Sequence, residues 1–299
     1  MNLILRAKRR LKKEFNKIFN PPYGEILALH CVVEKRSQLK ENRAMEITPT
    51  FLEQTILNYK AAGYRLVSLD EVQQQVEKRK RSRRKFVCFT LDDGYADNLK
   101  YAYPVFQKHN CPFAIYVTTD YPDRKAQFWW NQLEVVLIKY EKLTINSVEY
   151  DCSDLKKKNQ TFKQIREKVY SEAQITQTAL QQLFKENDCD ASDLALSWEQ
   201  IVELASNPLC TIAAHSVTHA SLPALSDEMI RKELSEGKKK IEEKIKKPVK
   251  HFSYPYGNCD SRVVDLVKEQ YSTAVLNRGG FVQKNDNLYT LNRRILFDN

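Results

Sequence analysis

The fold is decided by residues 86–94, which read Phe86-Val87-Cys88-Phe89-Thr90-Leu91-Asp92-Asp93-Gly94. The first six residues are apolar or β-branched, which is typical of a strand buried on both faces in a parallel sheet covered by helices. Gly94 marks a sharp turn directly after this strand. Asp92 and Asp93 therefore follow the carboxyl end of a buried strand, where enzymes built on parallel sheets place their active sites. Neighbouring side chains point in different directions, so one carboxylate can bind a metal ion while the other accepts a proton.

Similar apolar runs recur along the chain and alternate with helical patterns. They predict strands near 25–33, 64–68, 86–91, 112–118, 210–214, 251–254 and 273–276. Helices are expected near 49–62, with Thr48 as the cap and Pro49 at the first position, and near 70–80, 97–109, 226–246 and 260–270. This alternation indicates an α/β fold, either an open doubly wound sheet or a closed barrel, and seven units favour a TIM-like barrel.

Residues 120–207 fit neither pattern. They are polar and mostly helical, with a small hairpin expected near 143–151, so we interpret them as an insertion between two barrel strands rather than a separate domain. The insertion contains an aromatic cluster, Phe128-Trp129-Trp130. Trp129 could stack on a sugar ring, and the alternative is that these aromatic residues anchor a helix to its own core.

Two further segments follow the ends of predicted strands. The first reads His215-Ser216-Val217-Thr218-His219, and a helical turn or compact loop would bring its two imidazoles to one ion. Together with Asp93, the two histidines make a three-ligand metal site with positions left for water and substrate. The second segment reads Phe252-Ser253-Tyr254-Pro255-Tyr256-Gly257. Its proline and glycine fix the loop, which either presents the Tyr256 amide to the site or caps the barrel.

In this order the three segments resemble the motifs of the polysaccharide deacetylases, carbohydrate esterase family four. That family shows T-F-D-D-G, then H-[S/T]-x-x-H, then R-x-P-Y, against Thr90-Leu91-Asp92-Asp93-Gly94, the histidine segment and Ser253-Tyr254-Pro255-Tyr256 here. The segments Ile26-Leu27-Ala28-Leu29-His30-Cys31-Val32 and Leu196-Ser197-Trp198-Glu199-Gln200 also resemble stretches frequent in the family. The resemblance extends from about residue 25 to about residue 297.

The resemblance implies a distorted (β/α)7 barrel that removes an acetyl group, usually N-linked, from a sugar with the help of a divalent metal ion. It implies that Asp93, His215 and His219 bind the ion, with zinc expected first and cobalt or nickel next, and that Asp92 is the general base. The Tyr256 amide would stabilise the oxyanion. Substrate contacts are expected at Tyr256, Pro255, Trp129 and Arg293.

The chain departs from the family pattern at two places. Ser253 replaces the arginine that orients the base, and Arg293 or Arg294 is the candidate to replace it. The late Leu-x-His motif, which supplies a general acid, has no counterpart because no histidine follows His251. By elimination His30, toward the carboxyl end of the first strand, is the candidate acid, because His109 and His251 fall on the wrong face of the barrel.

The net charge of +10 is concentrated in residues 1–20, 77–85 and 231–250, none of them interleaved with aromatic residues, so we expect no nucleic-acid partner. Residues 1–20 place apolar side chains at helical spacing among seven basic ones, which predicts a basic amphipathic helix ahead of a barrel domain at 21–299. This helix lies either on an anionic membrane or on its own barrel. No export signal, no transmembrane segment and scattered cysteines predict a cytoplasmic protein, with the inner face of the membrane as a contact.

Three functions remain open from the sequence. The first is a deacetylase acting on an N-acetylated sugar of a cell-envelope polysaccharide or its lipid-linked precursor. The second is a catalytically silent glycan-binding or scaffolding relative, since two motif elements are missing. The third, a non-haem iron oxygenase, shares two histidines and a carboxylate, but such enzymes usually space them H-x-D…H on a β-sandwich, and the α/β pattern disfavours it.

Overall fold

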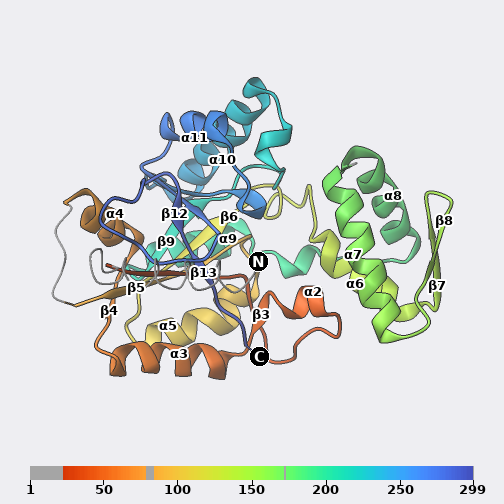
Figure 1. The fold of residues 1–299 in the computed structure, drawn as a ribbon, viewed down its shortest axis with the longest axis horizontal. Helices are drawn as coiled ribbons and strands as arrows, with labels where there is room; N and C mark the ends of the chain where they lie inside the picture. Colours follow the sequence, from red (N-terminus) through yellow and green to blue (C-terminus); the bar gives the residue numbers. More distant parts are fainter. Residues whose placement is uncertain (1–22, 79–83, 172, 299) are drawn as a thin grey trace, which may run out of the picture.

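Parallel strands form the centre of the molecule (Figure 1). The structure, a computed structural model, describes residues 23–78, 84–171 and 173–298; the amphipathic segment expected at 1–20 lies outside them. The strands follow the order β12-β11-β10-β9-β6-β5-β1-β13, with β4 also paired to β5. They are β1 (Gly24–Leu29), β4 (Arg65–Leu66), β5 (Phe86–Leu91), β6 (Phe113–Val117), β9 (Cys210–Ala214), β10 (His251–Ser253), β11 (Thr273–Leu276), β12 (Leu291–Asn292) and β13 (Arg294–Ile295). The expected α/β barrel is confirmed, and it is nearly closed.

The two edges of the sheet meet in one continuous segment of chain. Strand β12 pairs with β11, strand β13 pairs with β1, and only Arg293 stands between β12 and β13. The amide of Arg293 donates to the Leu276 carbonyl at 2.8 Å, and the amide of Leu296 donates to the Ala28 carbonyl at 3.0 Å. Residues 291–296 therefore act as a seam that connects the first and last parts of the barrel.

Two predicted elements differ from the structure. The strand expected at 64–68 is reduced to β4, which pairs with only Phe86 and Val87, because β6 takes over the same edge of β5 from Phe89 onward. The seam, through β12 and β13, instead completes the sheet between β11 and β1. The hydrophobic pattern of the sequence did not predict a strand there. The helix expected at 97–109 is a π-helical turn, η1 (Asn98–Ala102), followed by α5 (Tyr103–Lys108). Pro104 lacks an amide hydrogen and so interrupts the helical ladder at this junction.

The other barrel helices lie where the sequence predicts helices, except α9, which falls within residues 120–207, the stretch expected to be an insertion. They are α3 (Pro49–Ala61), α4 (Leu69–Glu77), α9 (Trp198–Ser206), α10 (Asp227–Ile245) and α11 (Ser261–Lys268). Thr48 caps α3 by accepting the Phe51 amide at 3.2 Å, with Pro49 in the first turn, as expected. None of the helices that the structure describes is long and apolar enough to cross a bilayer.

Side chains of each strand alternate between the barrel interior and the layer under the helices. In β5, Phe86 and Cys88 pack with interior side chains such as Tyr116 and Val275, whereas Val87 and Phe89 belong to the core beneath the helices. The same alternation turns the next even-numbered residues, Thr90 and Asp92, toward the barrel axis.

A helical lobe stands beside the barrel, drawn in green in Figure 1. It consists of α6 (Trp129–Lys139), the antiparallel hairpin β7 (Lys142–Ile145) and β8 (Val148–Asp151), α7 (Leu155–Ser171) and α8 (Ala173–Glu186). The hairpin expected near 143–151 is confirmed. The lobe has its own apolar core, which includes Trp130, Leu133 and Phe162.

The lobe is attached to the barrel through α2 (Lys40–Arg43), which lies between β2 (Cys31–Val32) and β3 (Glu46–Ile47). The Asn42 amide donates to the Trp130 carbonyl at 3.0 Å and to the Glu134 carboxylate at 2.7 Å. Glu41 forms an ion pair with Arg166 of α7. These contacts fix the lobe over one side of the barrel mouth. Two expectations on domain bounds remain predictions. One is that the barrel domain begins at residue 21, after the helix at 1–20, and the other is that the insertion runs from about 120 to 207.

Candidate active site

Asp92 and Asp93 follow β5 at the barrel mouth and point to different neighbours. The Asp92 amide still donates to the Leu29 carbonyl at 2.9 Å, so the sheet continues to this residue. Asp93 has φ of 74° and Gly94 has φ of 79°, so the chain turns sharply through the left-handed region. Aspartate tolerates this region better than most residues. The turn leaves both carboxylates buried, each with at most 2% of its surface exposed.

The two histidines lie on a tight loop that follows β9. Ser216 and His219 adopt φ of 67° and 61°, and the His219 amide donates to the Ser216 hydroxyl at 3.0 Å. Glu233 of α10 holds the middle of the loop by accepting the Val217 amide at 2.8 Å and the Thr218 amide at 3.0 Å. The loop therefore presents both imidazoles to the same point.

Asp93, His215 and His219 converge on one point, with one ligand atom from each lying within 4.8 Å of the others. Nε2 of His215 lies 3.3 Å from Oδ1 of Asp93, and Nε2 of His219 lies 3.2 Å from the same oxygen. The Nδ1 atom of His215 is 2.7 Å from the Ser253 carbonyl, which can only accept a hydrogen bond. Nδ1 therefore carries a proton, which leaves Nε2 as the His215 atom that could coordinate an ion beside Asp93.

This arrangement fits a divalent metal ion. Oδ1 of Asp93 is buried and has no hydrogen-bond partner among the described residues. An unpaired carboxylate oxygen beside an imidazole lone pair is costly in a buried site, and a cation between them removes the cost. Burial lowers the pKa of His219 and so favours the neutral imidazole that a metal ion requires, whereas the contacts of His215 with Asp93 and Asp92 outweigh burial and raise its pKa, so an ion there competes with a proton. Two histidines and one carboxylate are ligands typical of zinc and similar ions.

Asp92 is held by Arg293, a residue of the seam. Nη1 donates to Oδ1 at 2.7 Å and Nη2 donates to Oδ2 at 2.5 Å, and the guanidinium is fully buried. Nη2 also donates to the Ser253 hydroxyl at 2.9 Å, and Nη1 to the Thr90 hydroxyl at 3.0 Å. Burial by itself raises the pKa of Asp92, but the charge and hydrogen bonds of Arg293, together with the nearby His215 and His30, outweigh burial and hold the pKa below its ordinary value. Asp92 is therefore ionised and fixed in orientation.

A pocket of about 250 Å³ opens above these groups, and His30, Asp92, Asp93, His215, His219, Trp129, Tyr256 and Asn277 are among its lining residues. The site thus combines a carboxylate poised to accept a proton, a three-ligand metal position and room for a ligand. The sequence profile of the polysaccharide deacetylase family matches residues 79–275, about two thirds of the chain. The chain belongs to this family. It is accordingly a hydrolase of the carbohydrate deacetylase class.

Solved structures of deacetylases share the fold. The Streptococcus pyogenes deacetylase PplD, in complex with acetate, superposes with a TM-score of 0.63 at 16% identity over 92% of both chains. IcaB from Ammonifex degensii gives 0.61 at 17% identity, again over 92% of both chains. A de-N-acetylase from Aggregatibacter actinomycetemcomitans gives 0.61 at 16% identity, over 91% of this chain and 94% of that one. No curated protein matches the sequence.

The remaining expected site residues of the deacetylase divide into two groups. His30, Trp129 and Tyr256 line the pocket, and Nε2 of His30 lies 4.0 Å from Oδ2 of Asp92. Pro255 and Arg293 are buried and are not among the residues that line the active-site pocket, and their expected substrate contacts remain predictions. Of the two arginines proposed to replace the family arginine, Arg293 reaches Asp92.

Two residues of the deacetylase site were not found from the sequence. Glu233 holds the histidine loop, but a glutamate on a charged helix carries no signal that separates it from its solvated neighbours. Asn277 follows β11 and lines the pocket, and its buried Oδ1 has no partner among the described residues. Its place directly after a predicted strand is the signal that could have identified it.

Proposed function

We propose that this deacetylase hydrolyses the N-acetyl group of a sugar in a cell-envelope polysaccharide or its lipid-linked precursor. We propose zinc as the ion at Asp93, His215 and His219, with cobalt or nickel as substitutes. The observation that carries the proposal is the buried, unpaired Oδ1 of Asp93 facing two imidazoles, beside a carboxylate clamped by Arg293. Burying two carboxylates beside two imidazoles costs free energy, and neither a stable core nor a simple binding protein requires such a cluster.

The chain's own residues divide the work of amide hydrolysis. Lewis acidity at the acetyl carbonyl, and easier ionisation of the attacking water, are what a bound divalent ion supplies in such a site. Asp92 accepts the proton of the water, and the two hydrogen bonds from Arg293 hold the carboxylate in a fixed orientation. The amide of Tyr256, a residue with φ of 58°, is the proposed donor to the oxyanion. The carbon–nitrogen bond then breaks, and the departing amine takes up a proton.

We assign His30 as the proton donor to the amine. It lies on the pocket wall beside Asp92, and its side chain is 17% exposed, so it can exchange protons with solvent. Replacing His30 with alanine should lower turnover without lowering metal occupancy. Metal loss or a loss of stability in His30→Ala would instead make this histidine a ligand or a packing residue.

The proposed function is tested by acetate release from a panel of acetylated saccharides and lipid-linked sugars, after loading with zinc, cobalt or nickel. We expect release from N-acetylated sugars with every preparation that contains one equivalent of metal, and none after chelation. Release confined to O-acetylated sugars would reject the N-acetyl assignment. A protein that binds metal and glycan but releases no acetate would be the silent relative.

We also propose that residues 1–20 attach the enzyme to the inner face of the membrane, with the enzyme in the cytoplasm. Seven basic residues among apolar ones at helical spacing support this, since each basic group near an anionic surface contributes about 1 kcal/mol. Sedimentation with anionic vesicles should therefore be salt-sensitive and should require residues 1–20. Equal sedimentation with and without this segment would reject the proposal.

A further inference from the structure

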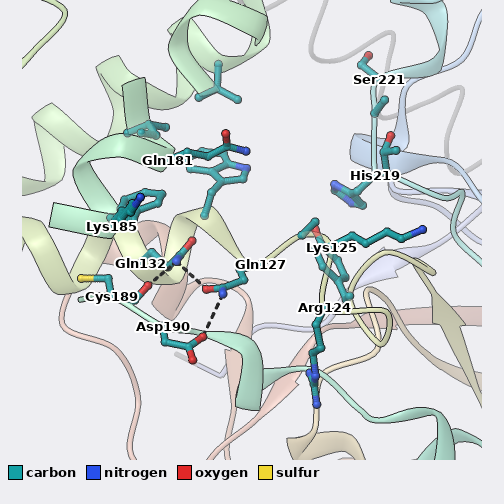
Figure 2. A pocket seen from close by; sticks show the side chains of 18 of the residues that line it. Arg124, Lys125, Gln127, Gln132, Gln181, Lys185, Cys189, Asp190, His219 and Ser221 are labelled. Atoms are coloured by element: carbon teal, nitrogen blue, oxygen red, sulfur yellow. Dashed lines mark hydrogen bonds between the residues drawn. The ribbon is translucent and has the colours of Figure 1, made fainter. Parts of the chain in front are cut away.

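A second cavity, of about 790 Å³, lies between the helical lobe and the barrel (Figure 2). We name it the insertion cleft. One wall is α8, with Gln181 and Lys185, and the facing wall is formed by the loops that follow β6 and β9, with Lys125 and Ser221. Gln127 and Gln132 lie along its floor. The cleft exists because the lobe stands away from the barrel at this side.

The insertion cleft is continuous with the active-site pocket. Trp129, His219 and Tyr256 line both cavities, so one ligand can pass from the metal position into the cleft. The active-site pocket, at about 250 Å³, falls just below the range of about 300 to 1,000 Å³ that holds a drug-sized ligand. The insertion cleft lies well inside that range. The site therefore has room for one small unit at the metal and for several more beside it.

The lining of the insertion cleft is rich in amides and aromatic side chains. Gln132 donates to the Gln127 side chain at 2.7 Å, and Gln127 donates to Asp190 at 3.0 Å, so the floor is a fixed polar network. Phe184 and Trp129 contribute apolar surface. The side chain of Gln181, in contrast, is exposed and forms no hydrogen bond with any part of the chain that the structure describes. Planar amides and aromatic faces suit sugar hydroxyl groups and ring faces.

The charges around the insertion cleft do not favour a polyanion. Arg124 is engaged by the backbone carbonyls of Ser192 and Ala195, and Lys125 lies 3.5 Å from Asp123. Asp188 and Asp190 also face the cleft and offset Lys185. A phosphate-rich or carboxylate-rich chain would meet no cluster of free cations here.

We propose that the insertion cleft binds further units of the same glycan chain, a neutral N-acetylated polymer, while one unit is deacetylated at the metal. This inference rests on the proposed function and adds a requirement for chain length. Gln181 and Lys185 are the donors from the lobe to sugar oxygens. The lobe is then a determinant of substrate specificity rather than an addition to the scaffold.

The test compares kcat/KM for N-acetylated mono-, di-, tetra- and hexasaccharides, using the full chain loaded with zinc. We expect kcat/KM to rise with length, and Gln181→Ala to lower it about two- to tenfold more for the hexasaccharide than for the monosaccharide, as for one lost hydrogen bond. Gln182→Ala is the matched control. Gln182 is the next residue on α8, it is exposed, it donates to Glu186 at 2.7 Å, and it does not line the cleft.

A second variant obstructs the insertion cleft instead of removing a contact. Ala224 is exposed on the barrel wall of the cleft, so Ala224→Trp should fill part of it and lower the hexasaccharide rate more than the monosaccharide rate. Rates independent of length, with no length-dependent effect of either variant, would overturn the inference and leave the proposed function intact. Absence of acetate release from every saccharide would overturn both.

Discussion

Ser253 leaves space that an arginine at the same position would fill. Arg293 enters that space from the seam, donates to Ser253, and reaches both oxygens of Asp92. Asp92, the proposed base, is thus oriented by a guanidinium, as the family motif leads one to expect, but the guanidinium comes from a different segment of the chain. Arg294, the other candidate, lies outside and pairs with Glu25 at 2.8 Å.

Replacing Asp92 with asparagine should separate proton transfer from metal binding. The amide keeps the shape of the side chain but cannot accept the proton of the attacking water, so turnover should fall by about 10²- to 10⁴-fold. Metal content, measured by elemental analysis, should stay at one equivalent. Near-normal acetate release by Asp92→Asn would remove Asp92 from the role of base.

The pair formed by Arg293 and Asp92 should show strong coupling in a double-mutant cycle. Arg293→Met leaves a buried carboxylate without its partner, which should cost about 3–5 kcal/mol of unfolding free energy. Asp92→Asn in the same chain removes that charge, so the double variant should be less destabilised than the sum of the two single variants. Denaturant unfolding of the four proteins measures the coupling. Additive losses would show that Arg293 acts through packing alone.

At the level of single residues, spacing was sufficient to predict that Asp93, His215 and His219 converge beside Asp92, because short motifs on adjacent turns hold their geometry locally. The sequence could not show whether Arg293 or Arg294 replaces the family arginine, because that depends on which of the two side chains faces the barrel axis. Pro255 could not be separated from Tyr256 in the same way. The side-chain direction in a left-handed turn is a property of the folded loop.

Helix α10 carries the histidine loop as well as covering the barrel. Glu233 accepts two loop amides, and its other oxygen lies 2.8 Å from the Thr218 hydroxyl. Helix α10 thereby fixes the position of a five-residue segment that contains two of the proposed metal ligands. The helix itself was predicted from its pattern, but its contacts with the loop were not.

Glu233→Ala should weaken zinc binding by about tenfold, because the loop loses the acceptor that holds its backbone and the imidazoles lose their fixed spacing. The dissociation constant is measured by competition with a chromogenic chelator. Glu236→Ala is the matched control, because Glu236 lies on the same helix and is exposed. Equal affinities in the two variants would mean that the loop keeps its shape without Glu233.

Elements with continuous apolar runs were predicted well, and the errors fall where a short strand depends on its neighbours. Strand β4 looks like a barrel strand in isolation, but β6 competes for the same edge of β5. The seam is interrupted by polar and basic residues, so its pattern gives no strand signal. Its pairing depends on closure of the whole sheet.

The barrel carries a partly buried acid, Asp97, that should make its stability depend on pH. Oδ1 of Asp97 accepts the Val32 amide at 3.1 Å and the Asn98 side chain at 2.8 Å, and burial raises the pKa of this carboxyl to about 7 from its ordinary 3.8. The folded state therefore binds a proton that the unfolded state has released between these pH values. This contribution is complete below pH 3.8 and is lost as the pH rises through about 7.

Asp97→Asn should remove this dependence, because an amide oxygen keeps both hydrogen bonds and does not titrate. The wild-type free energy of unfolding should lose up to about 1.4 kcal/mol per pH unit from this group across the window, and the variant should show a flatter profile. Denaturant unfolding at about pH 5, 6, 7 and 8 gives the two slopes. Parallel profiles would contradict the assignment of the proton to Asp97.

The seam joins the closure of the barrel to the orientation of Asp92, the proposed base, because Arg293 belongs to the seam and holds both carboxylate oxygens. A few backbone hydrogen bonds hold residues 291–296 between β11 and β1, whereas the central strands are paired along their length. Segments with few such bonds open first. Opening the seam withdraws Arg293 from Asp92 while most helices stay intact. Thermal inactivation should therefore precede the loss of helical circular dichroism, and the interval between the two curves should shrink when the seam is reinforced.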